Sequence, residues 1–142
     1  MPEPVETYRG LVYPWQCDHM GHLNVMWYTA KFDEATWNLF FQVGITPSYV
    51  RDRNLGMVAV QQNTAYKREL RAGDVVFIRS RMLEVRDKVL RFLHEILNAE
   101  TLEVAATSEL TGVHFDRSAR RACPLPPEVA ERARALLATT PG

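Results

Sequence analysis

Cysteine is scarce in this sequence, and long apolar runs are missing from it. The two cysteines, Cys17 and Cys123, are far apart and form no framework of spacings, so two free thiols in a reducing compartment is the simpler interpretation. No uncharged stretch approaches the roughly 18–20 residues that span a bilayer. Residues 1–8 have neither a basic region nor an apolar core, unlike a secretory signal. We therefore expect a soluble, cytoplasmic protein without a membrane segment.

An excess of charge of one sign is also missing. Lys and Arg together number 17, as do Asp and Glu, so the formal net charge is zero. A general nucleic-acid binder needs a clustered basic excess that displaces counterions from phosphates, so we expect no nucleic-acid partner. A near-zero net charge also does little to oppose self-association.

The 142 residues fit one domain, 1–142, with a core at about 8–117 and a C-terminal helical tail at about 124–142. At this size folding can bury roughly 70% of the unfolded chain's surface, so no disulfide or metal is needed for stability. The periodicity of apolar residues predicts a strand, a long helix, four strands and a final helix. In residue numbers these are 8–14, 25–43, 57–66, 75–85, 89–97, 102–115 and 128–137.

One long apolar helix and one sheet each need a partner to bury against, so the helix must cross a face of the sheet. This order of elements predicts an α+β hotdog fold. In it an antiparallel sheet of about five strands wraps around one long central helix, with a further helix at the C-terminus. The tight polar turns between the later strands predict an antiparallel meander. Exposed edge strands and an uncovered face favour pairing with another copy.

The residues best suited to chemistry lie in the loop before the long helix. That loop contains the motif Asp18-x-x-Gly21-His22-x-Asn24, and an aromatic-rich helix follows it. This combination resembles the signature of the 4-hydroxybenzoyl-CoA thioesterase family. A later segment, 66–74, reads Tyr-Lys-Arg-Glu-Leu-Arg-Ala-Gly-Asp and resembles that family's strand-ending segment. The similarity runs over about residues 8–115. It implies an acyl-CoA thioesterase that yields a free acid and CoA, without a cofactor apart from the CoA of its substrate.

Asp18 matches the catalytic carboxylate of that family. It would either attack the thioester carbonyl directly or deprotonate a water, and both routes stay open. An ordinary aspartate, with a pKa of about 3.9, is a feeble base, and burial beside Trp15 would raise that pKa. By analogy with the family, the backbone N–H of Val25 would point at the carbonyl from the positive end of the helix dipole and stabilise the oxyanion.

The remaining residues of the motif have smaller expected roles. His22 and Asn24, both candidates for the catalytic site, would orient Asp18, a water or the helix entry; alternatively His22 would simply bond a backbone group. Asn24 is an N-cap candidate, and Gly21 allows a tight turn through a positive φ. Side chains of types that bind metals also occur in the loop. Structural zinc sites usually have two separated ligand pairs, and here the second pair would have to be His114 and Cys123, whose spacing fits no familiar zinc site. We predict no metal.

The acyl group would be bound by aromatic and polar side chains. In the resembled family a polar residue of a facing strand, often from the partner subunit, completes the pocket. Gln61 and Asn63, on one strand face, are candidates, although a solvent-facing strand edge explains them equally well. Aromatic residues near the helix would line an acyl pocket or cage a quaternary ammonium by cation–π contacts, with core packing as the alternative for Trp37. These are Trp15, Trp27, Trp37 and Tyr28.

Six cations at strand ends and turns are candidates for binding the CoA phosphates, although charges at turns are usually only solvated. We expect an acyl-CoA substrate and a homodimer or homotetramer with interfacial active sites. A non-catalytic acyl-CoA-binding or sensing module, and a hotdog dehydratase or hydratase, stay open as alternatives, as does the identity of the acyl group. The six cations are Lys67, Arg68, Arg71, Arg86, Lys88 and Arg91.

Overall fold

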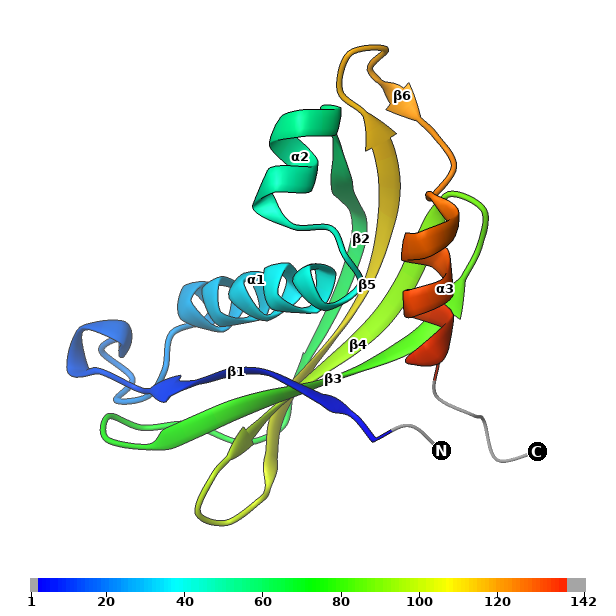
Figure 1. The fold of residues 1–142 in the computed structure, drawn as a ribbon. Helices are drawn as coiled ribbons and strands as arrows, with labels where there is room; N and C mark the ends of the chain where they lie inside the picture. The colour runs from blue at the N-terminus through cyan, green and yellow to red at the C-terminus, as the bar shows by residue number, and fades with distance from the viewer. Residues whose placement is uncertain (1–2, 138–142) are drawn as a thin grey trace.

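A long helix lies across one face of a curled antiparallel sheet in the computed structural model, which describes residues 3–137 (Figure 1). The strand order is β1–β3–β4–β5–β2, and the short β6 pairs with β5. None of the described helices has the length and hydrophobicity of a membrane span. The predicted hotdog fold is confirmed. Its elements are β1 (Val5–Leu11), a 3₁₀ turn (Pro14–Gln16), α1 (Val25–Gln42), α2 (Pro47–Arg53), β2 (Leu55–Tyr66), β3 (Val75–Val85), β4 (Val89–Asn98), β5 (Val104–Asp116), β6 (Arg121–Ala122) and α3 (Pro127–Ala135).

Helix α1 follows the predicted range to within one residue. It begins at Val25 because the Asn24 side chain accepts a hydrogen bond from the N–H of Met26, and it ends before Gly44, which has a φ of 96°. Lys31 of α1 is buried, although lysine side chains are usually exposed. Its ammonium donates to the Tyr8 hydroxyl at 2.9 Å and lies over that ring, so β1 supplies the polar partner that the helix face lacks.

Two hydrophobic clusters fill the space between α1 and the sheet, one near each end of the helix. A row of buried polar side chains lies between the two clusters, in register across the strands. His94 is its centre: its ring nitrogens lie 2.8 Å from the Thr36 hydroxyl and 2.6 Å from the Ser80 hydroxyl. Burial lowers the pKa of His94 to about 3, so the imidazole is neutral at physiological pH. The row ties the middle of α1 to the sheet.

Two sequence predictions about the strands are wrong. The first strand is Val5–Leu11 rather than 8–14, because Pro14 begins a 3₁₀ turn. The later strands are not a simple meander, since β2 pairs with β5 and not with β3. The segment 67–74 is therefore a crossing from one side of the sheet to the other. Its Leu70 is buried in the cluster near the start of α1, which a tight polar turn would not allow.

Helix α2 was not predicted. It begins at Pro47, and the hydroxyl of Thr46 caps it by accepting the N–H of Tyr49 at 3.1 Å. Helix α3 is shorter than the predicted 128–137, and residues 138–142 of the predicted tail lie outside the described residues. Both helices flank the C-terminal half of α1 (Figure 1).

Strand β2 forms one edge of the sheet. Residues 58–63 are exposed along its whole middle, and a register shift between Ala59 and Gln61 interrupts its ladder with β5. Val58 and Val60 are apolar and exposed at this edge. A long, unprotected apolar edge favours pairing with another strand.

Candidate active site

A tight turn before α1 holds Asp18. The N–H of Asp18 donates to the carbonyl of His22, and the N–H of Gly21 donates to the carbonyl of Asp18 at 3.0 Å. Gly21 takes a φ of 89°, as predicted, which an L side chain rarely adopts. The N–H of Leu23 then donates to the carbonyl of Leu70 at 2.7 Å, which fixes the turn to the 67–74 crossing.

The carboxylate of Asp18 accepts two hydrogen bonds of 2.8 Å, one from the side-chain amide of Asn24 and one from the N–H of Met20. These two bonds, that from Asn24 foremost, hold the pKa of Asp18 below its ordinary value. Burial beside Trp15, which would have raised this pKa, is not found. Trp15 is 66% exposed and stacks on Tyr13 instead, with ring centroids 4.3 Å apart.

Asn24 joins this carboxylate to the helix. Its side-chain oxygen accepts the N–H of Met26 at 2.9 Å while its side-chain NH₂ donates to Asp18. Within residues 3–137 the N–H of Val25 has no hydrogen-bond acceptor. Val25 is 57% exposed, so its N–H lies at an open helix N-terminus, where the dipole favours negative charge. Asn24, next to Val25, thus holds the Asp18 carboxylate near a free N–H donor, and a carboxylate and such a donor are two groups that acyl transfer can use.

A pocket of about 290 Å³ adjoins this helix N-terminus. The rings of Tyr28 and Tyr66 meet edge to face in it at 5.1 Å, and burial raises the pKa of Tyr28 to about 12. The imidazole of His22 lies 3.6 Å from the carboxylate of Glu69 on the same rim. Lys67 and Arg68 complete the lining with Leu23 and Val25.

The structure separates other predicted residues from this pocket. Gln61 and Asn63 do share one strand face, but they lie with Arg91, Glu109 and Thr111 on the side of the sheet away from α1. This is their position within a single protomer, and a role of Gln61 and Asn63 in binding the acyl group stays a prediction. Among the predicted aromatics, Tyr28 alone lines this pocket; Trp27 packs against the nearby cluster and Trp37 lies three turns along α1.

The six candidate phosphate-binding cations also fall into separate groups. Lys67, Arg68 and Arg71 belong to the crossing segment beside the helix N-terminus. Arg86 and Lys88 lie in the turn between β3 and β4, at the end of β3 opposite to the crossing segment. Arg91 is engaged on the outer sheet face by the carboxylates of Glu84 and Glu109.

The two buried histidines are satisfied by protein groups. His114 bonds the Tyr49 hydroxyl at 2.8 Å through Nε2, and its Nδ1 faces the carbonyl and the thiol of Cys123, both at 3.2 Å. Burial lowers the pKa of His114 and raises that of Cys123. Within residues 3–137 no three His, Cys, Asp or Glu side chains come close enough together to hold a metal ion.

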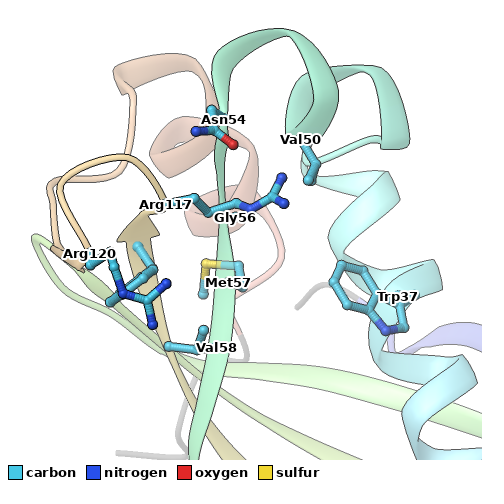
Figure 2. A pocket seen from close by; sticks show the side chains of 9 residues that line it. Trp37, Val50, Asn54, Gly56, Met57, Val58, Arg117 and Arg120 are labelled. Atoms are coloured by element: carbon cyan, nitrogen blue, oxygen red, sulfur yellow. The ribbon is translucent and has the colours of Figure 1, made fainter.

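A second, larger pocket, of about 510 Å³, lies at the other end of α1 (Figure 2). Trp37 forms one wall, Met57 and Val58 of β2 form the floor, and Arg117 and Arg120 approach from the turn after β5. The sequence prediction missed this pocket. An Arg-x-x-Arg pair in a turn was the available signal, but nothing in the sequence connects it with Trp37.

Sequence comparison relates most of the chain to one family. Residues 12–133 match the profile of the "Thioesterase-like superfamily". A protein of Agrobacterium fabrum named L-carnitine dehydrogenase/betainyl-CoA thioesterase is 32% identical over 110 residues. The aligned region covers 78% of this chain and 22% of that protein, so the chain spans about a fifth of the length of this curated relative.

Two solved structures are similar over nearly their whole length. A thioesterase of Thermus thermophilus, solved with coenzyme A and Zn, is 26% identical with a TM-score of 0.77, covering 92% of each chain. A Staphylococcus aureus protein in complex with CoA has a TM-score of 0.88 and 17% identity, covering 99% of this chain and 90% of that one. The second likeness is one of fold alone.

Proposed function

This chain belongs to the thioesterase-like superfamily, and from that membership we propose that it hydrolyses acyl-CoA thioesters to a carboxylic acid and CoA. The finding that carries the proposal is the anchored carboxylate of Asp18 beside the free N–H of Val25. A binding or sensing module would need the pocket but not this pair of groups. The membership also argues against a dehydratase or hydratase.

The proposed reaction begins with the thioester carbonyl oxygen at the N-terminus of α1, where it accepts the N–H of Val25. The lowered pKa keeps Asp18 ionised at neutral pH but makes it a weak base, which favours direct attack on the carbonyl carbon. The tetrahedral oxyanion collapses, the CoA thiolate leaves, and a mixed anhydride with Asp18 remains. Water then cleaves the anhydride to the acid and the regenerated Asp18 carboxylate; of the two protons of that water, one protonates the CoA thiolate and the other leaves with the acid.

Free-thiol release from a panel of acyl-CoAs tests this proposal. We expect Asp18→Asn to lower kcat by at least about 10³-fold, because the amide neither attacks nor accepts a proton. A folded Asp18→Asn protein, judged by its circular dichroism and melting temperature, with wild-type turnover would refute the assignment. Failure of the wild type to cleave any thioester while binding acyl-CoA would favour the binding module.

Neither step calls for a metal or a cofactor, because the carboxylate supplies the nucleophile and the helix N-terminus supplies the electrophilic stabilisation. We therefore propose a cofactor-independent hydrolase. Turnover that survives dialysis against a chelator is the expected result. Loss of turnover that returns on adding Zn²⁺ would contradict the proposal.

We propose further that the acyl group is small and cationic, as in betainyl-CoA, the substrate named for the Agrobacterium relative. The pocket at the helix N-terminus is small. Its groups that would attract a cation are the rings of Tyr28 and Tyr66 and the carboxylate of Glu69, which also pairs with His22 and Arg71, whereas Lys67 and Arg68 in the lining would repel one. A trimethylammonium group is attracted by aromatic faces and by a carboxylate. The positive end of the helix dipole alone would repel it.

A neutral isostere tests this preference. In 3,3-dimethylbutanoyl-CoA a carbon replaces the ammonium nitrogen of betainyl-CoA and leaves the shape unchanged. We expect kcat/KM to favour betainyl-CoA by about 2- to 30-fold for the cation–π term alone, and Tyr66→Leu to remove most of that preference. Equal kcat/KM for the two esters would refute the preference for a cationic acyl group. The thioesterase proposal does not depend on that outcome.

The proposed working unit is a two-fold homodimer joined through the β2 edges. Pairing would continue the sheet and cover Val58 and Val60 together with the exposed Trp37 and Phe41 of α1. We expect Val60→Lys to yield monomers in analytical ultracentrifugation, whereas Thr101→Lys in the exposed β4–β5 turn leaves the dimer intact. A monomeric wild type would contradict the assembly.

A further inference from the structure

Gln16 is the only buried residue among positions 13–22, the segment that contains Asp18. It is 8% exposed, whereas the neighbouring Trp15 is 66% exposed. A buried carboxamide costs free energy unless it is hydrogen-bonded. The Oε1 of Gln16 accepts the N–H of Tyr13 at 3.1 Å, and the N–H of Gln16 donates to the carbonyl of Tyr13 at 2.9 Å. Gln16 therefore fixes the 3₁₀ turn that precedes Asp18.

The same residue belongs to a small hairpin. The carbonyl of Gln16 accepts the N–H of Asn24 at 2.9 Å, and the N–H of Asp18 donates to the carbonyl of His22 at 3.2 Å. These two bonds flank an isolated antiparallel bridge, so Gln16 lies opposite Asn24 and Asp18 lies opposite His22. Asp18 and Asn24 are thus diagonal neighbours, and the side-chain amide of Asn24 reaches the carboxylate at 2.8 Å. A slip of one residue would turn the Asn24 side chain to the other face.

The two arms of this hairpin are held in different ways. Figure 1 shows the segment between β1 and α1 projecting beyond the start of the helix. The second arm is fixed to the crossing segment by the bond from the N–H of Leu23 to the carbonyl of Leu70. Upstream of the first arm, the chain is fixed as far as Val12, whose carbonyl accepts the N–H of Gly73 at 2.8 Å. Between Val12 and the hairpin, the side chain of Gln16 supplies the next tie.

We propose that Gln16 is a positioning residue: its buried carboxamide holds the hairpin in the register that brings Asn24 to Asp18. The inference rests on the proposed thioesterase function. Gln16 lies outside the lining of the pocket at the helix N-terminus, so it acts through Asn24 and does not touch the substrate. Asn24 also caps α1, because its side-chain oxygen accepts the N–H of Met26. One carboxamide therefore supports both the carboxylate and the helix start beside Val25.

Replacement of Gln16 by methionine tests this role, because methionine has nearly the same length and no amide. We expect Gln16→Met to lower kcat about tenfold, the equivalent of one or two lost hydrogen bonds, and to leave KM within about twofold. Gln42→Met makes the same change at an exposed position at the other end of α1 and should leave both constants unchanged. Wild-type kcat in a folded Gln16→Met protein would overturn the inference. Gln16→Asn, which keeps the amide on a shorter side chain, replaces Gln16→Met if that protein does not fold.

A double-mutant cycle tests the route through Asn24. In Asn24→Ser the amide that reaches Asp18 is already absent, so adding Gln16→Met should lower kcat less than about twofold further. A merely structural role of Gln16 would give the same loss in both backgrounds. An undiminished loss in the Asn24→Ser protein would overturn the route.

NMR titration of the Asp18 carboxyl separates this inference from the thioesterase proposal, since it needs no turnover. The pKa of Asp18 lies below its ordinary value because Asn24 and the N–H of Met20 donate to the carboxylate. Gln16→Met should raise this pKa toward the ordinary value, and Gln42→Met should not. An unchanged pKa in Gln16→Met would overturn the positioning role whatever the turnover. The expected rise in a protein that cleaves no thioester would support that role and refute the reaction alone.

Discussion

The two ends of helix α1 differ in what surrounds them. At the N-terminus Asn24 holds Asp18 and caps the helix through short hydrogen bonds, and the N–H of Val25 is free. A pocket of about 290 Å³ lies beside these groups. At the C-terminal half a pocket of about 510 Å³ combines an indole with two unpaired arginines. Of the groups proposed for bond cleavage, Val25 lines the smaller pocket, whereas Asp18 and Asn24 lie outside its lining; the larger pocket has none of them. Pocket size alone therefore does not locate the chemistry.

Among changes at the N-terminal end of α1, Asn24→Asp should have the largest effect on activity. Aspartate caps a helix as well as asparagine does, but it replaces the donor to Asp18 by a second carboxylate. We expect kcat to fall on the order of 10²-fold, because like charges raise the pKa of Asp18 and disturb its placement. Asn24→Ser is the matched variant that retains a cap and adds no charge. It should lose much less activity in a thiol-release assay.

The same pair of variants has a defined pH dependence. Activity needs ionised Asp18, whose pKa is lowered in the folded protein, so wild-type kcat/KM should persist on acidification until the pH falls through that lowered pKa. In Asn24→Ser the acid limb should move upward, toward the ordinary aspartate value, and in Asn24→Asp it should move further. An acid limb at the same pH in all three proteins would show that Asp18 does not control it.

A change in β4, opposite the middle of α1, should affect stability and leave both ends of the helix functional. His94→Leu removes the shared partner of the Thr36 and Ser80 hydroxyls, and we expect it to lower the free energy of unfolding by about 2 kcal/mol. Urea denaturation measures this loss. Because the imidazole is neutral and enclosed, kcat should change less than about twofold. A large loss of kcat in a folded variant would instead give His94 a role in the reaction.

The smallest expected effect is at the C-terminal end. Thr46→Ala removes the cap of α2, whose Val50 lines the larger pocket, and should cost about 1 kcal/mol in urea unfolding. Thr46→Ser should restore most of that stability. Equal losses in the two variants would assign the effect to the methyl group of Thr46 and not to its hydroxyl.

Local patterns predicted the parts of the molecule that depend on neighbours in sequence. Helical spacing defined α1, and the loop motif identified Asp18, Asn24 and Gly21 in the arrangement that the structure describes. Long-range features were missed. The pairing of β2 with β5 depends on which strands meet after the 67–74 crossing, and no turn signal records that choice.

The direction of side chains was also beyond the sequence. Lys31 fits a polar helix face, yet Tyr8 of β1 offers it a buried hydroxyl. The sequence left open whether Trp15 buries Asp18 and raises its pKa; in the structure Trp15 stacks on Tyr13, and two hydrogen-bond donors contact the carboxylate instead. In both cases the environment of the residue depends on a contact made in the folded structure, which the neighbours in sequence do not indicate.

The bond from the N–H of Leu23 to the carbonyl of Leu70 also bears on how the protein folds. It joins the Asp18 turn to a segment that lies beyond the whole of α1, α2 and β2, so a long loop must close before the turn is held. Contacts between such distant segments form slowly in β-rich proteins. A refolding chain should therefore acquire helical signal well before it acquires the carboxylate geometry, and any catalytic activity should return only with the slowest refolding phase.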